Sequence, residues 1–129
     1  MTFHARLSPS GADRWMTCTS SVQLEAPYED KSSTFADEGT VAHALAEQCL
    51  RRDHSAGDYI GLVFKTEASD GRPVELAIDG AIADYIDLYV EYVRDVLHSN
   101  DYITHWIEER VYYDDYVPEG SGTADCIAV

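Results

Sequence analysis

The chain has 129 residues, of which 45% are hydrophobic and 11% aromatic, and this suits one folded domain over residues 1–129. Its formal net charge of −15, from 24 acidic against 9 basic residues, repels nucleic acid unless metal ions, a local basic patch or further chain compensates. No run approaches the roughly 18 apolar residues of a membrane span, and the N-terminus lacks a signal-peptide core. Together with three widely spaced cysteines, this predicts a reduced, cytoplasmic protein with no membrane partner.

Residues 1–55 are predicted to hold the N-terminal helices. Helix-starting residues in the opening LSPSGADRWM indicate a short helix at 9–17. A second helical turn is expected at 20–25 and is stopped at Pro27, after which YEDKSS forms a polar connection.

A longer helix is expected from Thr34 to about Arg52, because Thr34 and Asp37 have the spacing of a capping box. Its buried face is predicted from apolar residues at helical spacing: Val41, Leu45 and Cys49, flanked by Ala42, Ala46 and Leu50. Another face carries Gly39, His43 and Glu47 at intervals of four residues. A glycine inside a helix costs about 1 kcal/mol relative to alanine, so Gly39 suggests close approach of another backbone or a ligand.

Residues 53–78 are predicted to form an irregular connection that includes a short hairpin. The clearest helix of the chain follows at 79–98, with Asp79 as its N-cap. A continuous apolar stripe defines its buried face: Ile82, Ile86, Tyr89, Val90, Val93 and Leu97. Acidic residues are expected away from that stripe: Asp84, Asp87, Glu91 and Asp95.

Residues 103–129 are predicted to form a β-hairpin. The segment ITHWIEERVYY alternates, DDYVPEGSG supplies the turn, and TADCIAV is the second strand. The expected fold class is therefore α+β, with helices packed on the beginning of a mixed β-sheet. Two strands are marginal in water unless helices cover them, and an open sheet edge is expected to permit self-association.

Asp125 lies in the middle of the second strand, between two faces of small or apolar residues. The strand is therefore expected to be buried, where an unpaired carboxylate is costly. Two interpretations remain open. Asp125 bonds the GSG turn or a helix N-terminus, or it is a metal ligand whose ion supplies the missing positive charge.

His43 is the second candidate for chemistry. A lone helical histidine is more often an exposed or hydrogen-bonded residue than a ligand, but its position one turn after Gly39 favours a tight polar face. Glu47 could orient His43, share an ion with it, or make a solvent-exposed pair at i,i+4. The sequence holds neither a GxSxG nucleophile motif nor a GxxxxGK[ST] or GxGxxG phosphate loop.

Four segments carry a family resemblance by their order: LSPSGADRWMTCTSSVQLE, SSTFADEGTVAHALAEQCL, YIDLYVEYVRDV and EERVYY…GSGTADCIAV. This order resembles the phage and prophage RecB-like exonucleases of the PD-(D/E)XK nuclease superfamily. The resemblance covers essentially the whole chain but only the N-terminal portion of such a nuclease. It implies an incomplete restriction-endonuclease-like core.

The resemblance also implies site residues. His43 and Asp125 would bind Mg²⁺ or Mn²⁺, with Asp125 as the catalytic carboxylate. Glu47, one turn after His43, and Glu38 are candidates for a supporting role beside these two. In that family a further strand supplies a second acid and a lysine. No strand follows Val129, and the two lysines, Lys31 and Lys65, match no part of the motif, so no efficient hydrolysis by this chain alone is expected. Some relatives begin an iron–sulfur cluster at the position of Cys18, but three further suitably spaced cysteines are missing, and no cluster is expected.

Two functions follow as expectations. The first is a truncated or degenerate metal-dependent DNA exonuclease of phage or prophage origin, acting on DNA if further chain completes it. The alternative is a small acidic phage protein, located in the bacterial cytoplasm, that binds and inhibits a host nucleic-acid-binding or defence protein, as a DNA mimic. The charge of −15 favours the alternative.

Overall fold

The computed structural model describes residues 5–28, 33–99 and 104–129. Its elements are η1 (Pro9–Gly11), α1 (Ala12–Thr17), α2 (Ser21–Glu25), α3 (Thr34–Arg52), η2 (Ala56–Tyr59), β1 (Val63–Glu67), β2 (Pro73–Ala77), α4 (Gly80–His98), β3 (His105–Tyr112) and β4 (Ser121–Ala128). These bounds confirm the α+β class and the predicted helices; the expected hairpin start at residue 103 lies outside the described residues. Within the described ranges, no helix combines the length and apolar content that crossing a bilayer requires.

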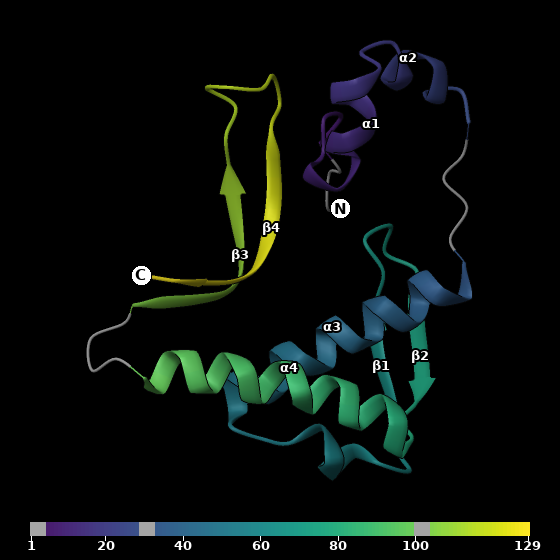
Figure 1. Cartoon of the computed structure of the whole chain (residues 1–129). Helices are drawn as coiled ribbons and strands as arrows, with labels where there is room; N and C mark the ends of the chain where they lie inside the picture. Colours follow the sequence, from purple (N-terminus) through teal and green to yellow (C-terminus); the bar gives the residue numbers. More distant parts are fainter. Residues whose placement is uncertain (1–4, 29–32, 100–103) are drawn as a thin grey trace.

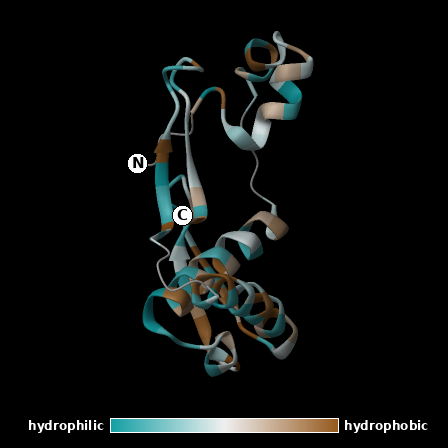
Figure 2. Cartoon of the chain, turned by 60° about the vertical axis from the view of Figure 1, so that its left-hand side comes forward, coloured by the Kyte–Doolittle hydropathy of each residue, from teal (hydrophilic) through white to brown (hydrophobic). Residues whose placement is uncertain are grey.

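The core lies where α3, α4 and the β1–β2 hairpin meet (Figure 1). Val41, Leu45 and Cys49 of α3 are fully buried, as the helical spacing predicts. They pack in one cluster with the buried stripe of α4: Ala83, Ile86 and Val90. Burying one such aliphatic side chain contributes about 1.5–3 kcal/mol, so this body carries most of the apolar stabilisation. Figure 2 shows hydrophobic residues gathered here, whereas hydrophilic and hydrophobic residues are mixed along the β3–β4 hairpin.

Helix α3 begins one residue after its N-cap, Ser33, whose hydroxyl accepts a hydrogen bond from the Ala36 amide at 3.2 Å. Asp37 does not complete the predicted capping box. Its carboxylate instead accepts two hydrogen bonds from the Arg72 guanidinium, at 2.7 and 3.2 Å. This bidentate pair fastens the first turns of α3 to the connection before β2.

Helix α4 begins as predicted, since the Asp79 carboxylate caps the Ile82 amide at 2.9 Å. Asp87 lies off the apolar stripe of α4, as predicted, but it does not face water alone. It is half-buried and accepts hydrogen bonds from the Ser55 hydroxyl at 2.6 Å and from the Ala56 and Gly57 amides at 2.6 and 3.1 Å. Asp87 therefore fastens η2 to α4.

The connection at 53–78 is more regular than the sequence suggests, because β1 and β2 form an antiparallel hairpin with Val63 opposite Ala77. The β3–β4 hairpin is the second sheet, with Ile107 opposite Cys126 and Glu109 opposite Ala124. Both sheets of the described residues are antiparallel pairs, so the expected beginning of a mixed sheet is not what these strands form.

The β3–β4 hairpin extends from the α3–α4 body towards the N-terminal helices (Figure 1). Near its turn, the Tyr113 hydroxyl contacts the Leu7 carbonyl at 3.5 Å. A Cβ added to Gly122 would lie 2.8 Å from Pro9 Cγ, so only glycine lets the N-terminal segment approach this strand so closely.

The expectation of a buried β4 strand is wrong. None of its residues is buried, and Asp125 is exposed. Small and apolar residues on both faces of a strand indicate burial only where both faces are covered. In the described structure this two-stranded hairpin stands out from the body instead of lying between two layers.

Of the two explanations for Gly39, close approach of another backbone is wrong among the described residues, and a ligand stays a prediction. A Cβ built on Gly39 would have no heavy atom within 4 Å, so neither a backbone nor a side chain approaches it closely.

Replacing Gly39 by alanine is therefore expected to raise the free energy of unfolding by up to about 1 kcal/mol, because alanine is the better helix former and meets open space. Urea denaturation of both proteins measures the difference. Gly120→Ala is the matched control and should destabilise, because its new methyl group would lie 2.5 Å from the Tyr113 ring. Loss of stability in Gly39→Ala would show that this helix face is covered.

Candidate metal centre

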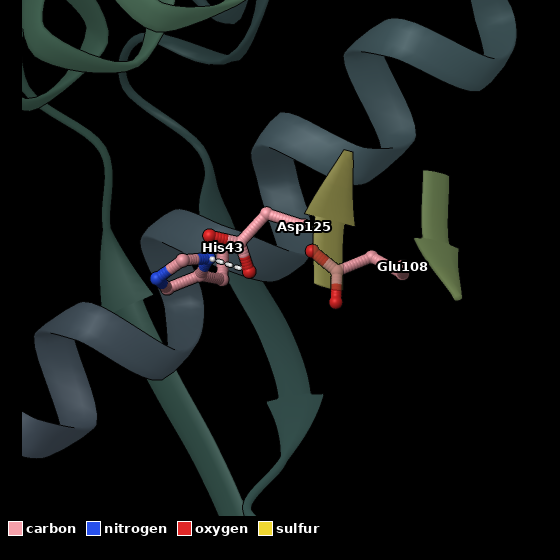
Figure 3. Close-up of side chains that lie close together, drawn as sticks. All are labelled: His43, Glu108 and Asp125. Atoms are coloured by element: carbon pink, nitrogen blue, oxygen red, sulfur yellow. Dashed lines mark ion pairs between the residues drawn. The ribbon is translucent and has the colours of Figure 1, made fainter. Parts of the chain in front are cut away.

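Three side chains from separate parts of the sequence converge beside α3: His43, Glu108 and Asp125. Each offers one ligand atom, and these atoms all lie within 4.8 Å of one another. Figure 3 shows the Asp125 side chain between the other two, with its carboxylate directed towards the His43 ring. Nδ1 of His43 lies 3.6 Å from Oδ1 of Asp125. The structure therefore brings together the two residues that the sequence analysis selected, and adds a third.

The antiparallel register of the hairpin explains why Glu108 meets Asp125. Ile107 pairs with Cys126 and Glu109 pairs with Ala124, so Glu108 stands across from Asp125. Glu108 has a φ of 52°, in the left-handed region that residues other than glycine seldom adopt. Such strain persists only where surrounding structure imposes it, and it is concentrated at functional sites.

Helix α3 supplies His43 and also holds the hairpin in place. Two turns after His43, Nη2 of Arg51 donates a hydrogen bond to the Ile107 carbonyl at 2.8 Å, directly before Glu108. The same guanidinium binds Glu47 Oε1 through its Nε at 2.7 Å. The histidine and the strand carrying Glu108 are thus fixed to one helix.

The Glu108 carboxylate lies in an electrostatically unfavourable environment. The pKa of Glu108 is raised, first because burial removes water from it and then because the charges of Asp125 and Glu47 are close. His43 and Arg51 act in the opposite direction. Negative charge at this point is therefore only partly compensated by the side chains around it.

An apolar cavity of about 230 Å³ adjoins two of the three residues, His43 and Asp125. His43 and Asp125 form part of its wall, together with Ala42, Ala46 and Tyr85, Ile86 and Tyr89 of the two helices. The pKa of the Tyr89 hydroxyl is raised by burial first and then by Asp125, Cys126 and Glu108. The site therefore opens on one side towards an aromatic wall that could contact the organic part of a ligand.

The three donors fit a divalent cation. Oxygen ligands lie about 2.0–2.6 Å from Mg²⁺ or Ca²⁺, so two ligands on opposite sides of one ion are about 4–5 Å apart. The three ligand atoms lie within 4.8 Å of one another, so small side-chain movements would bring them to the roughly 4 Å that separates opposite ligands of Mg²⁺. Two carboxylates and one imidazole are all accepted ligand types. The side chains of His43 and Asp125 are 62% and 52% exposed, which leaves room for water ligands.

The two candidates for a supporting role, Glu47 and Glu38, do not join this group. Glu47 makes the i,i+4 ion pair with Arg51, which was one of the alternatives for it, and it acts on Glu108 only through its charge. Glu38 is exposed on the second turn of α3 and is not part of the group of three.

Glu108 is the site residue that sequence reasoning missed. Strand alternation placed it on one face with Trp106, Arg110 and Tyr112, but alternation gives no cross-strand partner. The signal available was the hairpin itself. Once its register is known, the first glutamate of EER falls across from the aspartate of TAD. Glu108 is thus an acidic neighbour of Asp125 that precedes it in the chain.

The comparisons with known proteins bear on family and not on chemistry. No solved structure matches the chain. The family described as "Protein of unknown function (DUF2800)" matches residues 4–129, which is nearly the whole sequence. The chain therefore belongs to the DUF2800 family.

Proposed function

We propose that His43, Glu108 and Asp125 form a divalent-metal site for phosphodiester chemistry on DNA, of the kind used by PD-(D/E)XK exonucleases. The observation that carries this proposal is the convergence of the three ligand atoms within 4.8 Å of one another. The residues are far apart in the sequence: Glu108 follows His43 by 65 positions (108 − 43), and Asp125 follows Glu108 by 17 (125 − 108). Two of the three, His43 and Asp125, stand out in the sequence by themselves, and the resemblance to that superfamily implies a metal-ligand role for both. Mg²⁺ or Mn²⁺ is the ion that the resemblance implies, and the two carboxylates suit either ion.

The side chains of this chain have separable roles in the proposal. Asp125, between the other two ligands, is the central carboxylate, and Glu108 and His43 complete the protein part of the coordination. Arg51 is a positioning residue, because it joins α3 to the Ile107 carbonyl without belonging to the ligand group. A bound divalent ion would polarise the phosphodiester and lower the pKa of an attacking water.

The lysine of the superfamily motif has no counterpart in this site. Lys65 pairs with Glu75 at 3.3 Å, and Lys31 lies outside the described residues. Loss of one electrostatic stabiliser of a transition state commonly lowers the rate by about 10²–10³. The proposed function of the isolated chain is therefore metal-dependent DNA binding with little hydrolysis.

Mn²⁺ is expected to strengthen binding of the chain to a linear DNA oligonucleotide, because the ion joins the carboxylates to a backbone phosphate. Fluorescence anisotropy with labelled DNA, with and without Mn²⁺, measures this effect. His43→Ala and Asp125→Ala should remove the Mn²⁺ dependence and leave the metal-free affinity unchanged or higher. Equal affinities of the wild-type chain with and without Mn²⁺ would contradict the proposal. Rapid cleavage of that DNA would contradict the expected lack of hydrolysis.

A second candidate function rests on the charge of −15. Asp84, Glu91 and Asp95 are exposed along α4, where they could imitate the phosphates of a nucleic acid towards a basic host protein. Such binding should weaken steeply as salt is raised. Affinity purification from a bacterial host at low and high salt tests it, and the absence of any salt-sensitive nucleic-acid-binding partner would reject it.

A further inference from the structure

A second cavity, of about 320 Å³, lies between the C-terminal half of α3 and β1. Three basic residues line it: Arg51 and Arg52 from the last turn of α3, and Lys65 from β1. Gln48 and Thr66 add neutral hydrogen-bonding groups, and Glu47 adds one carboxylate. We call this cavity the cationic groove.

The groove is unusual for so acidic a chain. It gathers three of the 9 lysines and arginines of the whole sequence, whose net charge is −15. The nearby carboxylates compensate only part of this charge. Glu47 pairs with Arg51 and Glu75 pairs with Lys65, so three cations against two carboxylates (3 − 2) leave one net positive charge. Both pairs are at least one-third exposed, and exposed pairs of this kind exchange partners at little cost.

Arginines in the last turn of a helix are also favourable for the helix dipole, so their presence alone identifies no ligand. What distinguishes these arginines is their connection to the metal centre. Arg51 binds the carbonyl of Ile107, the neighbour of Glu108, and Glu47 lies one turn from His43 and raises the pKa of Glu108. Arg51 therefore lies at both sites: it lines the cationic groove, and it binds the backbone next to the metal ligand Glu108.

The separation of the two sites matches the spacing of a polynucleotide. Arg51 follows His43 by eight positions (51 − 43), or about 12 Å along the helix at 1.5 Å per residue. A stacked nucleic-acid strand carries one phosphate per roughly 3.4 Å of axis, so this distance corresponds to three or four nucleotides. A duplex has twice that charge density and would meet stronger repulsion from the acidic surface, which favours a single strand.

We propose that the cationic groove binds backbone phosphates of a single DNA strand, a few nucleotides from the phosphate at the metal centre. This inference rests on the proposed function, since the metal centre sets where the strand lies. Arg52 and Lys65 make the phosphate contacts that determine affinity. Arg51 both contacts the strand and holds β3 against α3.

Salt dependence of binding to a labelled oligothymidylate of about eight nucleotides, in Ca²⁺ to prevent cleavage, tests this proposal. Each lost phosphate contact lowers the slope of log K against log salt by about 0.7 for single strands. Arg52→Ala combined with Lys65→Ala should therefore lower the slope by about 1.4 and reduce the affinity at low salt by roughly tenfold or more. Because both side chains are exposed, the variant should retain its fold, which its circular dichroism and urea midpoint verify.

Arg14→Ala combined with Arg6→Ala is the matched control, because it changes the net charge equally but alters exposed arginines near the N-terminus. An unchanged slope and affinity in the groove variant, or equal losses in both variants, would overturn the groove proposal. Mn²⁺ titration separates this result from the proposed function. If wild-type protein and groove variant bind Mn²⁺ equally and only the DNA slope falls, both proposals stand. If neither binds Mn²⁺ but the slope still falls, the metal centre fails and the phosphate groove stands alone.

Discussion

Replacing Asp125 by alanine is expected to weaken Mn²⁺ binding by at least about 100-fold. Substitutions that only orient a metal ligand typically cost 10–100-fold, and Asp125 is itself the central ligand of the proposed site. Its carboxylate faces His43 at 3.6 Å and stands across the hairpin from Glu108. Without the Asp125 carboxylate, His43 and Glu108 are the two remaining protein ligands of the proposed site, and the ion loses its central ligand.

Isothermal titration calorimetry with Mn²⁺ measures this loss of affinity. A comparison of Glu108→Gln with Glu109→Gln then tests whether the ion is coordinated or only attracted by negative charge. Glu108→Gln removes one negative charge while keeping the shape of the side chain and the same backbone strain. Glu109→Gln is the matched control, because Glu109 is exposed on the same strand and makes the same charge change. Equal weakening by both glutamine variants would mean that general attraction to an acidic protein, and not coordination by Glu108, binds the ion.

Asp87→Ala is expected to lower the free energy of unfolding by about 2–3 kcal/mol. The substitution removes a carboxylate that accepts hydrogen bonds from the Ser55 hydroxyl and from the amides of Ala56 and Gly57. Leaving such part-buried donors without a partner costs about 1–3 kcal/mol, more when the lost acceptor is charged. Urea denaturation measures the loss, and Asp84→Ala, an exposed acid of the same helix, should change stability by less than about 0.5 kcal/mol.

The contribution of Asp87 should depend on pH in a defined direction. Burial raises the pKa of Asp87, but the hydrogen bonds from Ser55, Ala56 and Gly57, and the nearby Arg94, outweigh it and leave the pKa below its usual 3.8. A carboxyl whose folded-state pKa is depressed stabilises the protein above its unfolded-state pKa and loses that contribution as pH falls through the folded-state value. The stability difference between wild type and Asp87→Ala should therefore be full at neutral pH and shrink below about pH 3.8. A constant difference down to strongly acidic pH would show that the carboxylate charge contributes nothing.

Helices were the part of the fold that local sequence specified well. The buried face of α3 follows from the four-residue spacing of Val41, Leu45 and Cys49, and the start of α4 follows from the cap at Asp79. Both patterns can be recognised within one helix, and both predictions are confirmed. The strands were less predictable. Small residues on both faces of β4 predict burial, but a strand of a two-stranded hairpin can leave both faces open to water.

The sequence predicts individual candidate ligands of the site, but not which residues the fold brings together with them. His43 and Asp125 stood out because each is unusual in its own element. Glu108 did not, since its role comes from a cross-strand register and a left-handed backbone conformation that alternation does not encode. Gly39 misled for a related reason: a glycine in a helix does not state whether anything packs against it.

A crystal structure of the chain with Mn²⁺, with anomalous diffraction recorded near the manganese absorption edge, tests the metal centre most directly. The expected result is one strong anomalous peak about 2.0–2.6 Å from a ring nitrogen of His43 and from carboxylate oxygens of Glu108 and Asp125. Little movement of α3 or of the β3–β4 hairpin should be needed, because the ligand atoms already lie within 4.8 Å of one another. A Mn²⁺ peak bound only by other acidic residues, or no peak at millimolar Mn²⁺, would contradict the proposed site.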